Sequence, residues 1–331
     1  MVIITKTHTK LLQWTYMNIK LLTLVAVIVV VVIAGYFLTR EQSNSGVSEI
    51  RLGSFSKAVD YAPYLVAKNK GWFEEAAEKY GATVKYTEFQ SLPPINESFA
   101  TDRVDVVFEA EAPAIVGKAA GIDIKIVGAG VFLTQEIIVH KDSSIKTVKD
   151  LRGKKIAVLA GTSAHQGLVT VLNINGLTAN DVQVVDMVPP DAKAAFESNS
   201  VDAWAVWPPF PQQEQVAGKA ESLAGSEIFI QSVAVARGKL VKENPKLVNN
   251  LLDIIRKAQQ WIVANPSEAQ KIVAQELGLT LDVVQLAWPK HDFTPTIGEK
   301  EIADIQAKAD FLYSIGLIKN TVKASELVYV R

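Results

Sequence analysis

The sequence predicts an α/β fold made of two similar lobes, each a parallel-rich sheet flanked by helices. Two observations support this prediction. Strand and helix patterns alternate from Glu49 onward, and the same order of elements returns in the second half of the chain. Alternating strands and helices favour parallel strands joined by helical crossovers.

The first lobe begins with four patterned segments. Residues 49–55 predict a short strand, residues 64–81 carry apolar side chains at helical spacing and close on Gly81, and residues 82–89 predict a second strand. Residues 97–113 then contain the end of a helix, a polar turn, a strand and a loop.

The second half repeats this order. Residues 154–177 predict a strand, a turn at Gly161 and a helix, residues 182–190 predict a strand, and residues 194–209 contain a helix end, a turn, a strand and a loop. The two halves can be aligned at their polar turns. The aligned pairs are Phe99 with Phe196, Asp102 with Asn199, Val104 with Val201, and Asp105 with Asp202.

Beyond the second lobe, residues 227–238 predict one further strand. Residues from 242 onward predict helices, including 245–266 and 299–317.

The composition excludes several classes of function. The 331 residues carry a formal net charge of −1 without a long basic run, which gives no electrostatic basis for binding nucleic acid. The chain has no cysteine, so disulfides, thiol nucleophiles and a lipid-modified cysteine are excluded. The four histidines have no standard metal-binding spacing, and we expect no metal, no cofactor and no enzyme activity.

An apolar stretch near the N-terminus predicts export. Leu21 to Leu38 is an uncharged run long enough for a membrane helix, and Met17 with Lys20 ahead of it is typical of a signal start. The run is either cleaved as a signal or kept as an anchor. We therefore expect residues 1–47 to be an extension, a signal or anchor and a polar tether, and the rest of the chain to be extracytoplasmic.

Ligands of open parallel sheets bind beyond the carboxyl ends of the strands. That rule selects four segments, two from each half, which we expect to face one cleft. They are residues 54–63, 109–113, 161–165 and 207–210.

Several motifs carry a resemblance to a known family. They are "EAPAIVGKAAG", "LRGKKIAVLAGTSAHQGL", "PPDAKAAFESNSVDAWAVWPP" and "ADFLYSIGLI". They resemble the extracytoplasmic substrate-binding proteins of the aliphatic sulfonate, taurine and nitrate class of ABC importers. The resemblance implies the two-lobe periplasmic-binding-protein fold (type II), with a hinge and closure around the ligand. Lobe I would comprise residues 48–139 and 231–331, and lobe II residues 140–230.

The second lobe supplies the expected anion-binding groups. A sulfonate stays ionised and needs hydrogen-bond donors, which a helix N-terminus provides. Thr162 and Ser163 open such a helix and are either ligand donors or caps. The resemblance adds His165 as a donor and Trp207 as a wall for the carbon tail; Trp204 faces the other side of the strand and is expected in the core.

The first lobe supplies the remaining candidates, which are Ser54, Ser56, Tyr61, Glu111 and Pro113. Glu111 is either a supporting residue or a partner for a cation on the ligand. The resemblance places Ser232 where taurine-binding relatives have an acidic residue, which favours a plain alkanesulfonate over taurine.

The sequence thus predicts a monomeric binding protein that captures an organosulfonate for an ABC permease and ATPase. Alternatives are a binding protein for nitrate, a thiamine precursor or another small anion. A membrane-anchored ligand sensor is the alternative from another class.

Overall fold

A computed structural model describes residues 47–55, 58–294 and 296–330. The predicted signal or anchor at residues 21–38, and Ser56 among the predicted site residues, lie outside this range. In the described part of the chain, every helix is too short or too polar to cross a bilayer.

The first half of the chain forms three parallel strands. Strand β1 (Glu49–Phe55) lies between β2 (Thr83–Phe89) and β3 (Val106–Ala110) and pairs in parallel with both. The connecting helices are α2 (Ala62–Asn69), α3 (Trp72–Glu78) and α4 (Leu92–Ala100), and the 3-10 turn η1 (Val59–Tyr61) precedes α2. The predicted alternation is confirmed here.

The prediction of a single helix over residues 64–81 is wrong, because the chain forms two helices there, α2 and α3. Gly71, between α2 and α3, has a left-handed backbone with φ 70°. Glycine adopts this conformation without the steric penalty of a Cβ atom, and a left-handed residue ends an α-helix. The helical spacing of apolar residues continues on both sides of the break.

The second half repeats the arrangement. Strand β5 (Lys155–Val158) pairs in parallel with β6 (Gln183–Asp186) and β7 (Ala203–Val206). Helices α6 (Ser163–Ile174) and α7 (Pro189–Glu197) connect them, followed by α8 (Phe210–Val216) and the short strand β8 (Ala220–Ser222). All four residues of β7 are buried, as are all five of β3, so the core surrounds these strands.

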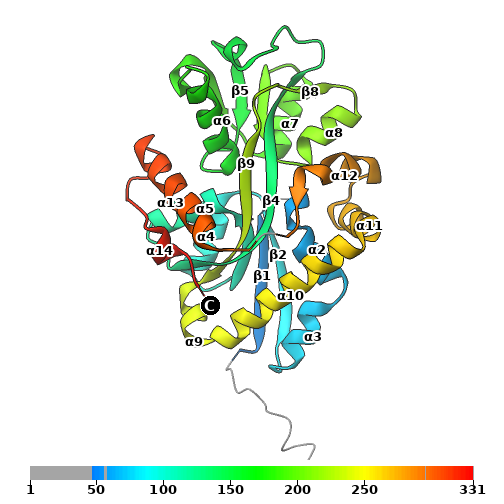
Figure 1. The fold of residues 1–331 in the computed structure, drawn as a ribbon, viewed down its shortest axis with the longest axis vertical. Coiled ribbons are helices and arrows are strands. Elements are labelled where there is room, and N and C mark those ends of the chain that lie inside the picture. The colour runs from blue at the N-terminus through cyan, green and yellow to red at the C-terminus, as the bar shows by residue number, and fades with distance from the viewer. Residues whose placement is uncertain (1–46, 56–57, 295, 331) are drawn as a thin grey trace, which may run out of the picture. The chain divides into compact units, whose positions relative to one another are not determined.

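Two long antiparallel strands connect the halves (Figure 1). Strand β4 (Ile124–His140) pairs with β9 (Ile228–Arg237) as far as Gln135 and with β7 from Glu136 onward. The strand order is β2-β1-β3-β9-β4-β7-β5-β6. The alternation of short strands and helices does not predict β4, whose register shifts twice along its pairing with β9.

The polar turns aligned from the sequence adopt the same backbone conformation. Asp102 and Asn199 have φ angles of 56° and 57°, and they are the two non-glycine residues of the described chain with positive φ. Phe99 and Phe196, three residues earlier, are both buried. Asp and Asn tolerate this left-handed conformation better than other side chains.

The aspartates of the repeat also make the same hydrogen bond. The Arg51 backbone N–H donates to Asp105 Oδ2 at 2.9 Å, and the Lys155 backbone N–H donates to Asp202 Oδ2 at 2.8 Å. Each aspartate therefore joins the start of the third strand to the first strand of its half. The internal repeat predicted from the sequence is confirmed.

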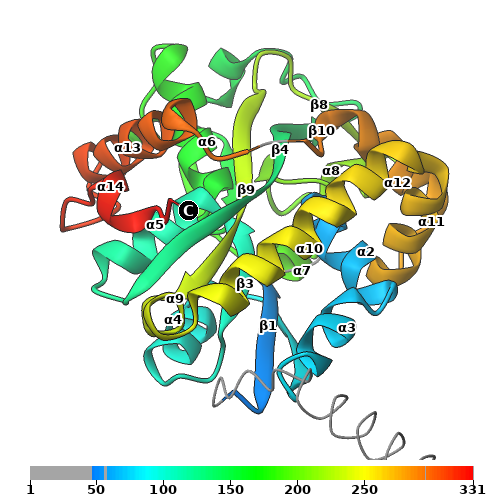
Figure 2. The same ribbon diagram turned by 60° about the horizontal axis from the view of Figure 1, so that its bottom comes forward.

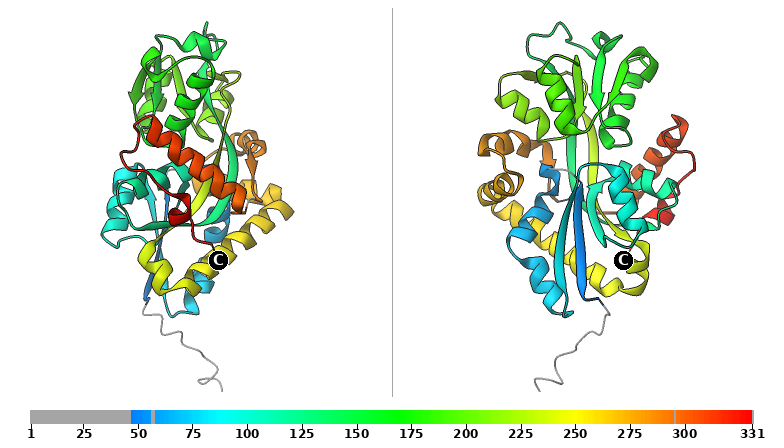
Figure 3. Two further views of the ribbon diagram at one scale, coloured as in Figure 1. Left: turned by 60° about the vertical axis from the view of Figure 1, so that its left-hand side comes forward. Right: turned by 180° about the vertical axis from the view of Figure 1, so that it is seen from behind.

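The C-terminal helices cover both sides of the first-half strands. Figures 2 and 3 show α10 (Pro245–Ala264) and α11 (Pro266–Leu277) on the side of α2 and α3, and α13 (Glu299–Ser314) on the side of α5 (Glu111–Ala119). The remaining elements are α9 (Gly238–Glu243), α12 (Leu281–Ala287), β10 (His291–Asp292) and α14 (Ala324–Leu327), with 3-10 turns at Val148–Leu151, Ala179–Asp181 and Trp288–Lys290.

Candidate functional site

One small pocket lies at the carboxyl ends of strands from both halves, and we call it the strand-end pocket. Its cavity measures about 20 Å³, roughly the room that one water molecule needs. Its lining residues are Phe55, Asp60, Tyr61, Ala110, Pro113, Thr162, Ser163, Trp207 and Ile230. Five predicted site residues are therefore brought together: Tyr61, Pro113, Thr162, Ser163 and Trp207.

Thr162 caps helix α6 beside the pocket. Its hydroxyl donates to the Leu159 carbonyl at 2.6 Å and accepts from the His165 backbone N–H at 3.4 Å. Both interactions are local, so the hydroxyl stabilises the helix start and is already engaged. Of the two roles left open by the sequence, the structure places this side chain in the cap.

Ser163 is the first residue of α6, and its hydroxyl is in a different situation. The side chain is 3% exposed, and its Oγ finds no hydrogen-bond partner among the described residues. Its carbonyl accepts from the Gln135 side-chain amide, which fixes the backbone at this point. An unpaired buried hydroxyl costs free energy that a ligand oxygen can recover.

Trp207 follows β7 and closes the pocket from the second half. Its ring lies 5.8 Å from that of Phe55, from the first half, and 6.0 Å from that of Phe210. The side chain is 6% exposed, and Nε1 lacks a partner within the described chain. The indole N–H can only donate, so this atom suits a ligand acceptor. Trp204, in contrast, is 1% exposed and packs against Phe210, as the core role predicted for it requires.

Asp60, in η1, is the carboxyl group of the pocket. It is 3% exposed, and its Oδ1 is also without a partner in the residues described. Burial raises the pKa of Asp60 to about 7, hydrogen bonding to its own backbone opposes the rise, and the charge of Glu111 adds to it. This carboxyl group therefore changes protonation state near neutral pH.

Two predicted residues lie close to the pocket without lining it. The His165 ring accepts at Nδ1 from the Gly161 backbone N–H at 3.3 Å, and burial lowers its pKa although Asp186 partly opposes this. Ser232 accepts at Oγ from the Val131 backbone N–H at 2.8 Å. Ligand contact by either residue stays a prediction.

The prediction of a loop over residues 109–113 is wrong. Strand β3 runs to Ala110, and α5 begins directly at Glu111. The Glu111 carboxylate is fully buried, pairs with Lys308, and accepts from the Gln231 backbone N–H at 2.9 Å. Glu111 therefore connects α5 to α13 and β9. Of this segment, Ala110 and Pro113 line the strand-end pocket.

Ser54 faces a neighbouring depression between β1, β2 and α2. A side-chain hydrogen bond joins it to Tyr64. The sequence interpretation did not single out Asp60, Phe55, Ala110 or Ile230 as site residues. The signal for Asp60 was its position just past the end of β1, within the loop that the strand-end rule selects.

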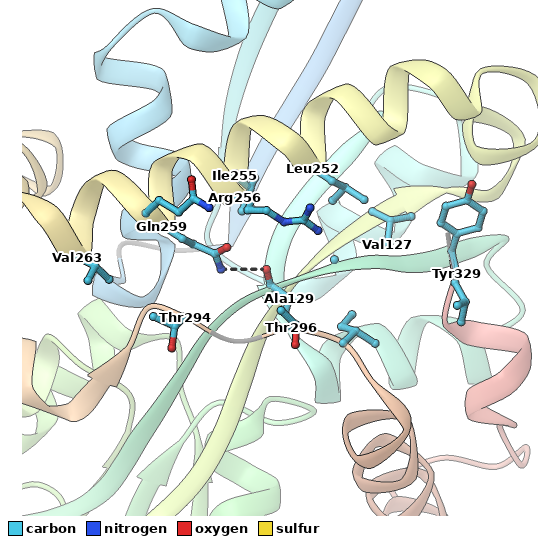
Figure 4. Close-up of a pocket in the computed structure, with 14 residues that line it drawn as sticks. Val127, Ala129, Leu252, Ile255, Arg256, Gln259, Val263, Thr294, Thr296 and Tyr329 are labelled. Atoms are coloured by element: carbon cyan, nitrogen blue, oxygen red, sulfur yellow. Dashed lines mark hydrogen bonds between the residues drawn. The ribbon is translucent and has the colours of Figure 1, made fainter.

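A wider groove lies between α10 and the C-terminal segment (Figure 4). Its lining includes Leu252 and Ile255, and Gln259 donates to the carbonyls of Ala129 at 3.5 Å and Gly130 at 2.7 Å. Among the described residues, none with an unpaired buried polar side-chain atom lines this groove. The strand-end pocket contains three such atoms and is therefore the better polar-ligand site.

The side chains that line the pocket suit a small polar ligand that also has an apolar part. Trp207 and Ser163 supply donors near the opening of α6, Asp60 supplies a carboxyl group, and Phe55 and Ile230 supply apolar walls. Nowhere in the described ranges do three His, Asp or Glu side chains group as metal ligands would.

Comparison with known proteins shows the family to which the chain belongs. Residues 58–269 match the family described as NMT1/THI5 like. A Bacillus subtilis protein named as an aliphatic sulfonates-binding protein is 34% identical over 316 residues, which cover 90% of this chain and 93% of the relative. The taurine-binding periplasmic protein of Escherichia coli is 27% identical over 57% of this chain and 61% of its own length.

A solved structure agrees with these relatives. The alkanesulfonate-binding protein SsuA from Xanthomonas axonopodis pv. citri, bound to MOPS, has a TM-score of 0.76 and 25% identity, covering 85% of this chain and 98% of its own. The resemblance and the fold class predicted from the sequence are confirmed. The chain belongs to the NMT1/THI5-like family.

Proposed function

We propose that this protein is the extracytoplasmic binding protein of an ABC importer. It captures a small organosulfonate in the strand-end pocket and delivers it to a membrane permease with its ATPase. Residues 21–38 direct the chain through the membrane, as a signal or as an anchor. The relatives named as sulfonate-binding proteins and the solved relative with bound MOPS support this ligand class.

One observation carries the proposal. Trp207 Nε1 and Ser163 Oγ are buried in the same pocket, and neither has a hydrogen-bond partner in the described residues. Both can donate to an oxygen of a permanently ionised sulfonate, and the N–H groups at the opening of α6 favour negative charge there. The apolar walls suit a short hydrocarbon part.

We further propose that the halves move as lobes about β4 and β9. Both strands pair within the first-half sheet, and β4 alone continues into pairing with β7. Trp207 and Phe55 meet across the pocket from different halves. The cavity of about 20 Å³ between the halves is too small for a sulfonate, so the proposal requires the halves to move apart about the two strands for a ligand to enter.

We propose binding without catalysis, because the relatives and the solved structure named above are binding proteins. Ligand recovered after incubation with the protein should be chemically unchanged.

The direct test is calorimetric titration of the purified full chain with ethanesulfonate, taurine and nitrate. We expect binding of sulfonates, because three oxygens and a carbon part match the donors and apolar walls. Heat of binding with nitrate alone would replace the sulfonate proposal by the nitrate alternative.

Ser163 and Thr162 provide a matched pair of variants. We expect Ser163→Ala to weaken sulfonate binding about tenfold, since a hydrogen bond to a charged group is worth about 1.5 kcal/mol or more. Its thermal stability without ligand should stay equal or rise, because an unpaired buried hydroxyl is removed. Calorimetry and thermal unfolding measure the two effects.

Thr162→Ala should show the opposite pattern. Loss of the cap lowers the free energy of unfolding by about 1 kcal/mol, while the hydroxyl, already engaged with Leu159, contributes little to the ligand. Equal losses of affinity in both variants would contradict the distinct roles given to the two hydroxyls.

A further inference from the structure

A carboxyl group is an unexpected lining for a pocket whose other polar groups suit an anion. Asp60 lines the strand-end pocket and is 3% exposed. Its Oδ1 has no hydrogen-bond partner among the described residues. A buried carboxylate with an unpaired oxygen is costly, so the group is stabilised by taking up a proton or by meeting a cation.

The backbone of Asp60 lies against β9. The Ser232 hydroxyl on β9 lies 3.3 Å from the Asp60 carbonyl oxygen and 3.4 Å from the Val131 carbonyl oxygen, and it can donate to either. The predicted preference for a plain alkanesulfonate rests on Ser232. This residue contacts the backbone of Asp60 and does not line the strand-end pocket. The carboxyl group that a ligand would meet in this pocket belongs to Asp60.

Among the described residues, the side-chain charge that acts on Asp60 is that of Glu111, from α5, which raises the pKa of Asp60. Lys308 of α13 is paired with the Glu111 carboxylate. Glu109, from β3, is buried with its pKa raised to about 8, and burial raises the pKa of Tyr61. A positive charge beside Asp60 would therefore come from the ligand or from a proton.

We propose that Asp60 is a specificity-determining residue that distinguishes ligands by the charge of the end opposite the sulfonate. This inference rests on the proposed function. A ligand with an ammonium group, an aminoalkanesulfonate, pairs with the ionised carboxylate. A plain alkanesulfonate binds only when Asp60 takes up a proton. Near and above neutral pH the protein therefore prefers the aminoalkanesulfonate.

The sign of the pH dependence differs between the two classes. The pKa of Asp60 without ligand is about 7. A plain sulfonate raises this pKa when it binds, so the affinity of the protein for a plain sulfonate falls as pH rises. An ammonium lowers the pKa, and its affinity rises with pH. Between about pH 6 and about pH 8, each affinity changes about tenfold in opposite directions.

The experiment is calorimetric titration of the full chain with ethanesulfonate and with taurine at both pH values. We expect the ratio of their dissociation constants to change about a hundredfold. Asp60→Asn has nearly the shape of the neutral acid and should remove the pH dependence of both ligands, with taurine weakened about tenfold at the higher pH. Glu109→Gln is the matched control for another buried acid and should keep the wild-type pH dependence.

The outcomes separate this inference from the proposed function. If sulfonates bind but both dissociation constants vary alike with pH in the wild type and in Asp60→Asn, Asp60 does not select the ligand. If the pH dependence disappears in Glu109→Gln instead, Glu109 is the titrating group. If neither sulfonate binds at either pH, the proposed function itself fails.

Discussion

Replacing Trp207 with alanine is expected to weaken sulfonate binding on the order of a hundredfold. The variant loses the indole N–H, whose hydrogen bond to a charged oxygen is worth about 1.5–3 kcal/mol. It also loses the ring contact with Phe55 across the pocket, worth about 0.5–1.5 kcal/mol. Each 1.4 kcal/mol is a factor of ten in affinity. Calorimetric titration with ethanesulfonate measures the loss.

Trp207→Phe separates the two contributions, because it keeps an aromatic ring and removes the donor. We expect about a tenfold loss of affinity. Trp204→Phe is the matched control, since Trp204 packs against Phe196 and Phe210 and lies outside the pocket lining. It should lower thermal stability and keep the affinity. Wild-type affinity in Trp207→Phe would show that the indole N–H does not hold the ligand.

The parts of the fold predicted from the sequence depend on local patterns. The polar turns at Asp102 and Asn199 can be aligned from the sequence because a Val-Asp pair follows each turn at the same spacing, and this alignment also brings Phe99 onto Phe196. Such turns need few distant contacts. The strand-end rule likewise selected Thr162, Ser163 and Trp207, because it depends on the order of elements alone.

Other features depend on contacts between distant segments. Asp60 is held by Ser232, 172 residues later, and Glu111 pairs with Lys308, 197 residues later. Spacing in the sequence does not reveal such pairs. Buried carboxyl groups are also rare, so a composition-based interpretation places Asp60 at the surface. Strand β4 was missed because its glycine-containing register shifts interrupt the usual alternation.

Asp105→Ala is expected to lower the free energy of unfolding by about 3 kcal/mol, the lower end of the range for breaking a buried ion pair. Asp105 is 3% exposed and accepts from the Arg51 backbone N–H at 2.9 Å, from Arg51 Nε and Nη2 at 2.9 and 2.8 Å, and from Arg237 Nη2 at 2.6 Å. Removing it leaves two guanidinium groups without their shared carboxylate. Urea unfolding of the full chain measures the change.

The internal repeat supplies the control for this prediction. Asp202 holds the equivalent position and accepts from the Lys155 backbone N–H at 2.8 Å, without an arginine partner among its described contacts. Asp202→Ala should therefore cost about 1 kcal/mol. Equal losses in the two variants would mean that the backbone bond, rather than the arginines, carries the stabilisation.

The pH dependence of the Asp105 contribution follows from its pKa. Burial raises the pKa of Asp105, but hydrogen bonds from Arg51 and Arg237 more than offset this and hold the pKa below its ordinary value. The stabilisation is thus complete above the unfolded-state pKa of about 3.9 and is lost as pH falls through the lower folded-state value. The difference in unfolding free energy between the wild type and Asp105→Ala should stay constant from neutral pH to about pH 4 and shrink below it. A difference that shrinks near neutral pH would point to a group other than this carboxylate.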